Sequence, residues 1–194
     1  MSRERIAIHL KSVEELGKVV GIAGFRDARV GDVPAFIGAA KARLPGIESQ
    51  FFDADRVADW EHLFFAALNA LKAFRAGRGL AQRLDMEVLV YASCQHQIAK
   101  AFGIVGLRPD SVRVAVVLIG DNEAEVRRGV ELVAGVVGVP DDSVLLVDQA
   151  KFERLREVFG ITDLELSAVM DPWDRFTAAK MLVVERCALV AFAK

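Results

Sequence analysis

Residues 112–119 form a nearly continuous run of aliphatic side chains, most of them β-branched, and this run constrains the fold more than any other segment. A half-exposed strand would alternate apolar and polar residues, so such a run is typical of a strand that is buried on both faces. The chain must therefore build a sheet with this strand inside it.

The other strand signals are shorter. Alternating or glycine-punctuated apolar residues indicate strands at residues 6–10, 19–25, 51–52 and 144–147, and a last strand is expected where the apolar stretch 181–192 leaves its helix. With the helices below, they predict an α+β fold, a mixed, mainly antiparallel sheet of about four to five strands packed with several helices. No repeat, linker or low-complexity tract interrupts the chain, so residues 1–194 are interpreted as a single domain.

Apolar residues that recur three and four apart predict the helices. The clearest helix begins at Asp59 and is stopped by Gly77 and Gly79. Asp121 or Asn122 can cap another, whose apolar face consists of valines. Further helices are expected at residues 33–44, at 82–92, at 97–102 with Gly103 closing it, at 151–159 with Gly160 ending it, and from Asp171-Pro172 onward.

The sequence carries no familiar catalytic motif: it lacks a phosphate-binding loop, a nucleophile elbow, an HExxH pair and a CxxC pair. Its three histidines are His9, His62 and His96, whereas a metal site needs at least three converging ligands. We therefore expect no catalytic residue, no metal and no cofactor. One alternative stays open, because residues 120–122 follow a buried strand and could hold a small-molecule substrate, although a helix cap explains them equally well.

Composition and apolar patterning place the protein in the cytoplasm, without a membrane segment. Charged residues interrupt the first apolar positions, so no secretory signal forms, and the apolar runs are far shorter than the ~20 residues that span a bilayer. Two cysteines, Cys94 and Cys187, fit a reducing compartment. Scarce Asn and Gln beside plentiful Arg and Glu are typical of thermophiles.

The long helix that begins at Asp59 carries a stripe of small and polar residues. These residues are spaced four, three and four apart, and they are His62, Ala66, Asn69 and Ala73. A ligand or a backbone could come close along such a stripe. Close packing of another helix explains it as well, and this second interpretation is favoured.

Charge is unevenly distributed behind a net charge of −2. Residues 109–174 hold six Lys and Arg against fourteen Asp and Glu, a local net charge of −8, so the rest of the chain sums to +6. Within that rest, residues 62–84 contain no acidic residue and four basic ones, Lys72, Arg75, Arg78 and Arg83. The totals exclude a general nucleic-acid coat and leave room for a local contact with an anion.

The helix macrodipole accounts for Lys72 and Arg75, because a cation near a helix C-terminus is stabilised by about 0.3 to 1 kcal/mol. It does not account for Arg78, which lies between two glycines beyond the helix, or for Arg83, which lies near a helix N-terminus. These two arginines invite an anionic partner, and the guanidinium fork suits a phosphate-bearing strand.

Several motifs then follow in a characteristic order. They are His62-Leu63, an Ala-rich helix with Asn69, the glycine-containing basic turn, Met86-Glu87 with Leu89, Tyr91-Ala92-Ser93, Gln97-Ile98 with Gly103, and the closing LVVERCALVAF. This order resembles the TPRKB-type family, the small kinase-binding subunit of the KEOPS complex. The chain departs from the family pattern at Gly79-Leu80, where members usually have Asn-Ile, and at His96, where members have Arg.

The resemblance implies a non-catalytic subunit of the machinery that installs threonylcarbamoyl-adenosine in tRNA. Such a subunit docks on the atypical kinase of KEOPS, meets the other KEOPS subunits only indirectly, and holds the single-stranded 3′ CCA end of tRNA. A base stacked on Phe65 or His62 would contribute about 1 to 3 kcal/mol. The tRNA-binding residues expected on this basis are His62, Asn69, Lys72, Arg75, Arg78 and Arg83.

Residues 161–176 are the expected kinase contact, because large apolar side chains crowd a short stretch there. The candidates are Leu166, Met170, Trp173 and Phe176, and Met170 and Trp173 are expected to lie partly exposed. The alternative is that most of these side chains belong to the core. A second possible function is a protein-interaction scaffold that makes no direct contact with RNA.

Overall fold

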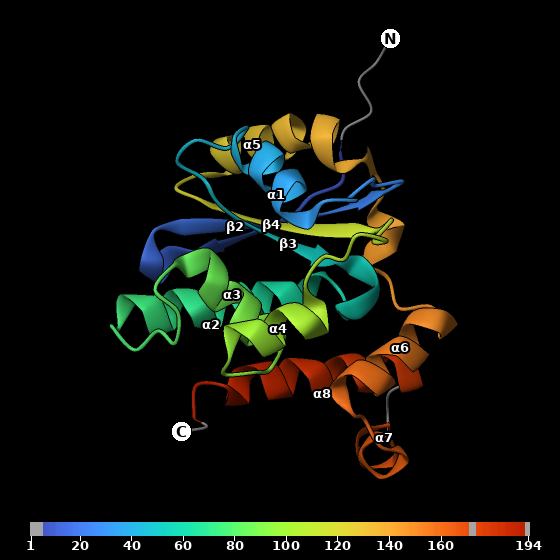
Figure 1. Cartoon of the computed structure of the whole chain (residues 1–194). Coiled ribbons are helices and arrows are strands. Elements are labelled where there is room, and N and C mark those ends of the chain that lie inside the picture. The colour runs from blue at the N-terminus through green and yellow to red at the C-terminus, as the bar shows by residue number, and fades with distance from the viewer. Residues whose placement is uncertain (1–5, 171–173, 193–194) are drawn as a thin grey trace. The chain divides into compact units, whose positions relative to one another are not determined.

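The computed structural model describes residues 6–170 and 174–192 (Figure 1). Contacts within the chain divide it into two compact units. The first contains Met1–Ala54 and Leu107–Leu145, and the second contains Asp55–Gly106 and Leu146–Lys194. The α+β class is confirmed, and the interpretation of residues 1–194 as a single domain stays a prediction.

The first unit is built on a five-stranded sheet. Its strands are β1 (His9–Val13), β2 (Lys18–Arg26), β3 (Glu48–Asp53), β4 (Val114–Gly120) and β5 (Val139–Pro140). Four of them lie in the order β1-β2-β4-β3 with antiparallel neighbours, and β5 pairs with the end of β2. All seven residues of β4 are buried, which confirms the expected strand with two covered faces.

Helices α1 (Val33–Lys41) and α5 (Glu123–Val137) cover one face of this sheet (Figure 1). The predicted cap of α5 is confirmed at Asn122, whose side chain accepts a hydrogen bond from the Glu125 backbone N–H at 2.9 Å. The valines of α5 pack into the core cluster of the unit together with side chains from β2, β3 and β4. The 3.6-residue period of α5 therefore decides which of its faces lies on the sheet.

The second unit is helical in the part of it that the structure describes. Its helices are α2 (Trp60–Arg75), α3 (Leu84–Ala92), α4 (Ile98–Val105), α6 (Gln149–Phe159), α7 (Asp163–Val169) and α8 (Arg175–Leu189). α2 packs against α3 and α8, and α6 and α7 also pack against α8. None of the described helices is both long and apolar enough to cross a bilayer.

Residues 144–147 do not form the predicted strand. Val144 and Leu145 belong instead to a 3-10 helix, η3 (Asp142–Leu145), and both side chains are buried. Gly24 on β2 permits this packing, because a Cβ there would lie 2.4 Å from Val144 Cγ2. The apolar run therefore enters the core as a helical turn.

The predicted C-terminal strand is also wrong, because α8 continues to Leu189 and residues 181–192 form no strand. The buried residues of α8 recur at helical spacing, and they are Ala178, Ala179, Leu182, Val183 and Cys187. Likewise, α4 passes through Gly103 and ends at Val105, and the first strand begins at His9. The predicted helix start at Asp171-Pro172 lies outside the described residues, and Asp174 caps α8.

Candidate functional site

The acid-free basic segment runs along α2 and continues through the turn between α2 and α3. α2 ends at Arg75, and Gly77 adopts a left-handed φ of 64° that a residue with a side chain rarely takes. The Arg78 backbone N–H then reaches back to Ala73 O at 2.9 Å, so carbonyls of the last helical turn are satisfied. The turn is therefore a defined helix cap.

The buried carboxylate of Glu87 binds the backbone of this turn. Glu87 on α3 is fully buried, and its two oxygens accept hydrogen bonds from the backbone N–H groups of Leu80 at 3.0 Å and Ala81 at 2.6 Å. Charge-assisted bonds of this kind are roughly twice as strong as neutral ones. Sequence reasoning noted Glu87 only as part of a motif and missed this role, because the pattern of residues does not reveal a side-chain contact seven positions away.

Arg83 has an anionic partner within the chain, which its place near a helix N-terminus did not predict. Its Nε and Nη2 donate to the two carboxylate oxygens of Asp85 at 3.1 and 2.6 Å, and the side chain of Asp85 is fully buried. The acid-free segment ends one residue before Asp85, so the charge count overlooked this partner. Pairing with Asp85 therefore neutralises part of the charge in this segment, whose other three basic residues are Lys72, Arg75 and Arg78.

Those three residues, Lys72, Arg75 and Arg78, are all exposed. Within the described residues, Arg78 forms no ion pair. Phe74, next to Arg75 in the chain, has 40% of its surface exposed, and its ring lies against Gly79, where a Cβ would be 3.3 Å from Phe74 Cδ2. Leu80 is exposed in the same turn. We call Lys72, Phe74, Arg75, Arg78 and Leu80 the basic turn surface. It combines cations with an accessible aromatic ring, and sequence reasoning missed Phe74 because it was counted with the apolar face of the helix.

His62 is not part of this surface. Its side chain is fully buried, Nδ1 accepts from the Ala58 backbone N–H at 3.2 Å, and Nε2 lies 2.9 Å from Ala92 O. Burial lowers the pKa of His62 from 6.5 to about 4, because the imidazolium would lose its hydration. A neutral ring with Nε2 protonated satisfies both bonds. The expectation that a base stacks on His62 is therefore corrected: no face of the ring is accessible.

The rest of the small-residue stripe is used for packing. Ala66 and Ala73 are buried, Asn69 is half-buried, and the side chain of Asn69 hydrogen-bonds the thiol of Cys187 on α8. The favoured interpretation, close packing of helices along α2, is confirmed. Asn69 consequently supports the fold from within, while Phe65, the other predicted stacking residue, is exposed on α2.

The structure brings together no metal site: no three His, Cys, Asp or Glu side chains converge in residues 6–170 and 174–192. Burial raises the pKa of the Cys94 thiol to about 12 and raises the pKa of Cys187 as well, so neither thiol ionises near neutral pH. The polar residues after β4 are engaged locally, because Asn122 caps α5 and Asp121 pairs with Lys18 at 2.5 Å.

A small cavity of about 260 Å³ lies elsewhere in the second unit. The α3–α4 turn, the end of α6 and the end of α8 line it, with Cys94, His96, Phe159, Arg186 and Leu189 among the lining residues. Cys94 takes a left-handed φ of 56° in this turn. His96, which stands where the family pattern has Arg, therefore lies at the mouth of a cavity rather than in the basic turn.

The expected kinase contact divides between core and surface. Leu166 is buried and Phe176 packs against the same core, whereas Met170 is 41% exposed as predicted. Trp173 lies outside the described residues. Leu164 belongs to the predicted stretch 161–176 but was not among the four candidate residues, and it is 80% exposed on α7. The sequence contained an indication of this exposure, because residues two apart on a helix, such as Leu164 and Leu166, point to different sides.

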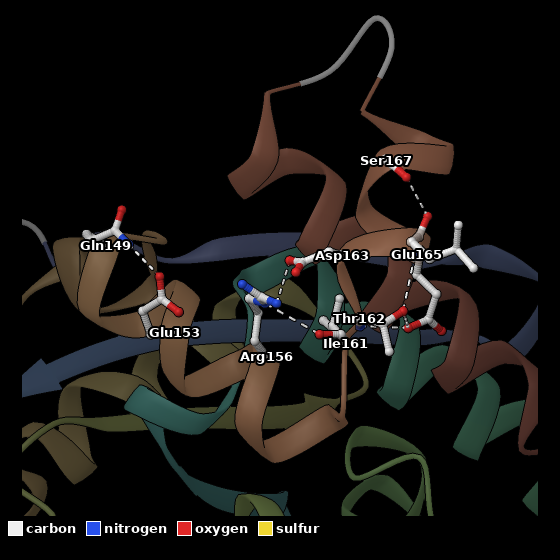
Figure 2. A network of polar contacts seen from close by, with 9 residues as sticks. Gln149, Glu153, Arg156, Ile161, Thr162, Asp163, Glu165 and Ser167 are labelled. Atoms are coloured by element: carbon white, nitrogen blue, oxygen red, sulfur yellow. Dashed lines mark hydrogen bonds and ion pairs between the residues drawn. The ribbon is translucent and has the colours of Figure 1, made fainter.

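Polar contacts fix the N-terminal end of α7 (Figure 2). Arg156 on α6 reaches Asp163 at 2.6 Å, and Thr162 forms a reciprocal capping box with Glu165. Hydrogen bonds from Thr162 and from Arg186 lower the pKa of Glu165 to about 2. A helix of seven residues is too short to be stable alone, so these contacts hold its exposed leucine in place.

Comparison with known proteins gives two findings. A protein-family model described as "Kinase binding protein CGI-121" matches residues 36–191. A protein named "Regulatory protein Cgi121", from Methanocaldococcus jannaschii, is 34% identical over 116 residues, which cover 60% of this chain and 72% of that protein. The matched region includes both the basic turn surface and α7.

Proposed function

The chain belongs to the CGI-121 family of kinase-binding proteins, and from this premise we propose that it is a non-catalytic subunit of a KEOPS-type complex. In this proposal it binds the atypical kinase of the complex in the cytoplasm and recruits tRNA for threonylcarbamoyladenosine modification by holding the 3′ CCA end. The kinase and the tRNA meet two different surfaces of the second unit.

The observation that carries the tRNA part is the basic turn surface. Single-stranded nucleic acid is held by cations that follow the backbone and by aromatic rings on which bases stack. The partly exposed ring of Phe74 lies against Gly79 in the turn that carries Arg78, and Lys72 and Arg75 are exposed on the last turn of α2. The hydrogen bonds to Glu87 fix the turn before any ligand arrives, so little ordering entropy is lost on binding.

The kinase part rests on family membership and on the exposed apolar side chains of α7. Leu164 and Met170 are accessible, whereas Leu166 and Phe176 anchor the region to the core. Exposed large aliphatic and Met side chains are suited to the desolvated centre of a protein interface.

Replacement of Arg78 by Gln tests the tRNA part. We expect weaker binding of tRNA and a salt dependence whose slope falls by about 0.7, the value for one phosphate contact on a single strand. The measurement is the dissociation constant over a series of salt concentrations. Arg127→Gln serves as the matched control, since Arg127 is an exposed arginine that pairs with Glu123 on α5. Equal affinities and slopes for wild type and Arg78→Gln would exclude the turn from the tRNA contact.

A scaffold that makes no contact with RNA is the second candidate, and the bidentate pairing of Arg83 with Asp85 favours it, since part of the basic charge is already neutralised. A scaffold of this kind would bind the kinase and would not respond to the CCA end.

A further inference from the structure

The first unit contains a groove formed by residues 43–47 and 124–132, which are separate in sequence from the basic turn surface. It is a cleft of about 480 Å³ between the loop that follows α1 and the outer side of α5. Pro45, Ile47 and Leu132 supply apolar lining, with Ala124 beside them, and Arg43, Glu125 and Arg128 supply the charged groups. We call these seven residues the α1–α5 groove. It is independent of the function proposed above.

The groove is fixed by the packing of its loop against α5. Gly129 faces the loop, and a Cβ at this position would lie 3.1 Å from Ile47 Cδ1 and 3.2 Å from Leu44 Cδ2. The absence of a side chain therefore lets the loop approach the helix closely. Backbone bonds from Leu44 N to Lys41 O at 2.9 Å and from Ile47 N to Leu44 O at 3.1 Å close the loop. A partner would meet a preformed surface.

The two arginines of the groove, Arg43 and Arg128, are both exposed. Within residues 6–170 and 174–192, neither Arg43 nor Arg128 forms an ion pair or a side-chain hydrogen bond, although the adjacent Arg127 pairs with Glu123. The carboxylate of Glu125 forms no ion pair with either of these arginines, and its Oε2 instead accepts the Asp121 backbone N–H at 2.7 Å in the cap of α5. Two accessible guanidinium groups consequently flank an apolar floor.

We propose that the α1–α5 groove binds a short acidic peptide segment of a protein partner. An aliphatic side chain of the peptide lies on Pro45, Ile47 and Leu132, and its carboxylates pair with Arg43 and Arg128. The planar guanidinium fork matches a carboxylate in two parallel hydrogen bonds. The lining contains no aromatic residue on which a base could stack, so the groove suits an aliphatic–acidic peptide better than a nucleic acid.

The test is an NMR titration of the full chain with a blocked eight-residue peptide of alternating Glu and Leu, and with the same peptide carrying Lys for Glu. We expect amide shifts concentrated at residues 43–47 and 124–132 with the acidic peptide and none with the basic one. The double variant Arg43→Ala/Arg128→Ala is expected to bind at least tenfold more weakly. Arg127→Ala, one position away, is the control and is expected to bind as the wild type does.

Several results would overturn the proposal. They are the absence of shifts at millimolar acidic peptide, shifts located elsewhere, equal binding of the basic peptide, and equal losses in the Arg127→Ala control. An oligouridylate that displaces the peptide and loses its own binding in the double variant would identify an RNA surface instead. The thermal unfolding temperature of each variant is measured as a control. A variant that unfolds at the wild-type temperature is folded, so its loss of binding is not caused by unfolding.

Discussion

At the scale of single residues, three buried side chains hold the start of the second unit together through hydrogen bonds. They are Asp85, Glu87 and His62. Glu87 and Asp85, two residues apart on α3, each bind the turn that precedes them. His62 joins the start of α2 to the end of α3 through its two ring nitrogens. The motif that resembles the TPRKB-type family is therefore largely a set of internal contacts that shape the basic turn surface.

Burial of His62 predicts a pH dependence of stability. The pKa of His62 is lowered in the folded state, from 6.5 to about 4, so the unfolded chain binds more protons between these two values. Stability is fully present above pH 6.5 and falls as the pH drops toward 4, by roughly 3 kcal/mol in total if each pH unit contributes about 1.4 kcal/mol.

Urea unfolding of wild type and His62→Gln at pH 7, 5.5 and 4.5 measures this loss. Gln retains a donor for Ala92 O and does not titrate. We expect the free energies of unfolding of the two proteins to converge as the pH falls. A constant difference at all three pH values would contradict the assignment of His62 as a neutral buried ring.

At the scale of elements, α7 is the clearest functional candidate beside the basic turn. The exposed Leu164 is held by a helix whose N-terminus is closed by the Thr162–Glu165 capping box and tied to α6 by Arg156 (Figure 2). These contacts lie on the surface and form a network, which orders the element more than any one surface ion pair would.

Replacement of Leu164 by Glu is expected to abolish co-purification with the kinase subunit and to leave the thermal unfolding temperature unchanged, because the side chain is 80% exposed in the isolated chain. Val112→Glu, at an exposed apolar position of the first unit, is the matched control. Retention of the kinase by Leu164→Glu, at the level seen with Val112→Glu, would exclude α7 from the contact.

Element types were predictable where periodicity was long and unbroken, as in β4, α2 and α5. They were not predictable where a short apolar run had two possible uses. Val144 and Leu145 pack onto Gly24 as a helical turn, and the stretch that ends at Phe192 is the continuation of α8 up to Leu189. For Val144 and Leu145 a contact distant in sequence decides the structure, and periodicity does not record it. For α8 the helical spacing of the buried residues was present in the sequence and continues to Cys187.

At the scale of the whole molecule, a net charge near zero conceals local surfaces of positive charge. The basic segment was visible in the sequence, and so was its position between two helices. The pairing of Arg83 with Asp85 and the burial of His62 were not, because each depends on a side-chain direction. The α1–α5 groove gave no sequence signal, since Arg43 and Arg128 are 85 positions apart in the chain and meet only in the fold.

The decisive measurement for tRNA binding through the 3′ end is the affinity of the purified protein for intact tRNA, compared with its affinity for the same tRNA lacking the CCA end. Loss of three nucleotides removes the proposed stacking and phosphate contacts at the basic turn surface, and we expect binding to weaken by at least tenfold, since one stacked base contributes about 1 to 3 kcal/mol. Equal affinity for the two tRNAs would exclude binding of the CCA end at the basic turn surface and would favour a kinase-binding scaffold that does not hold the tRNA end.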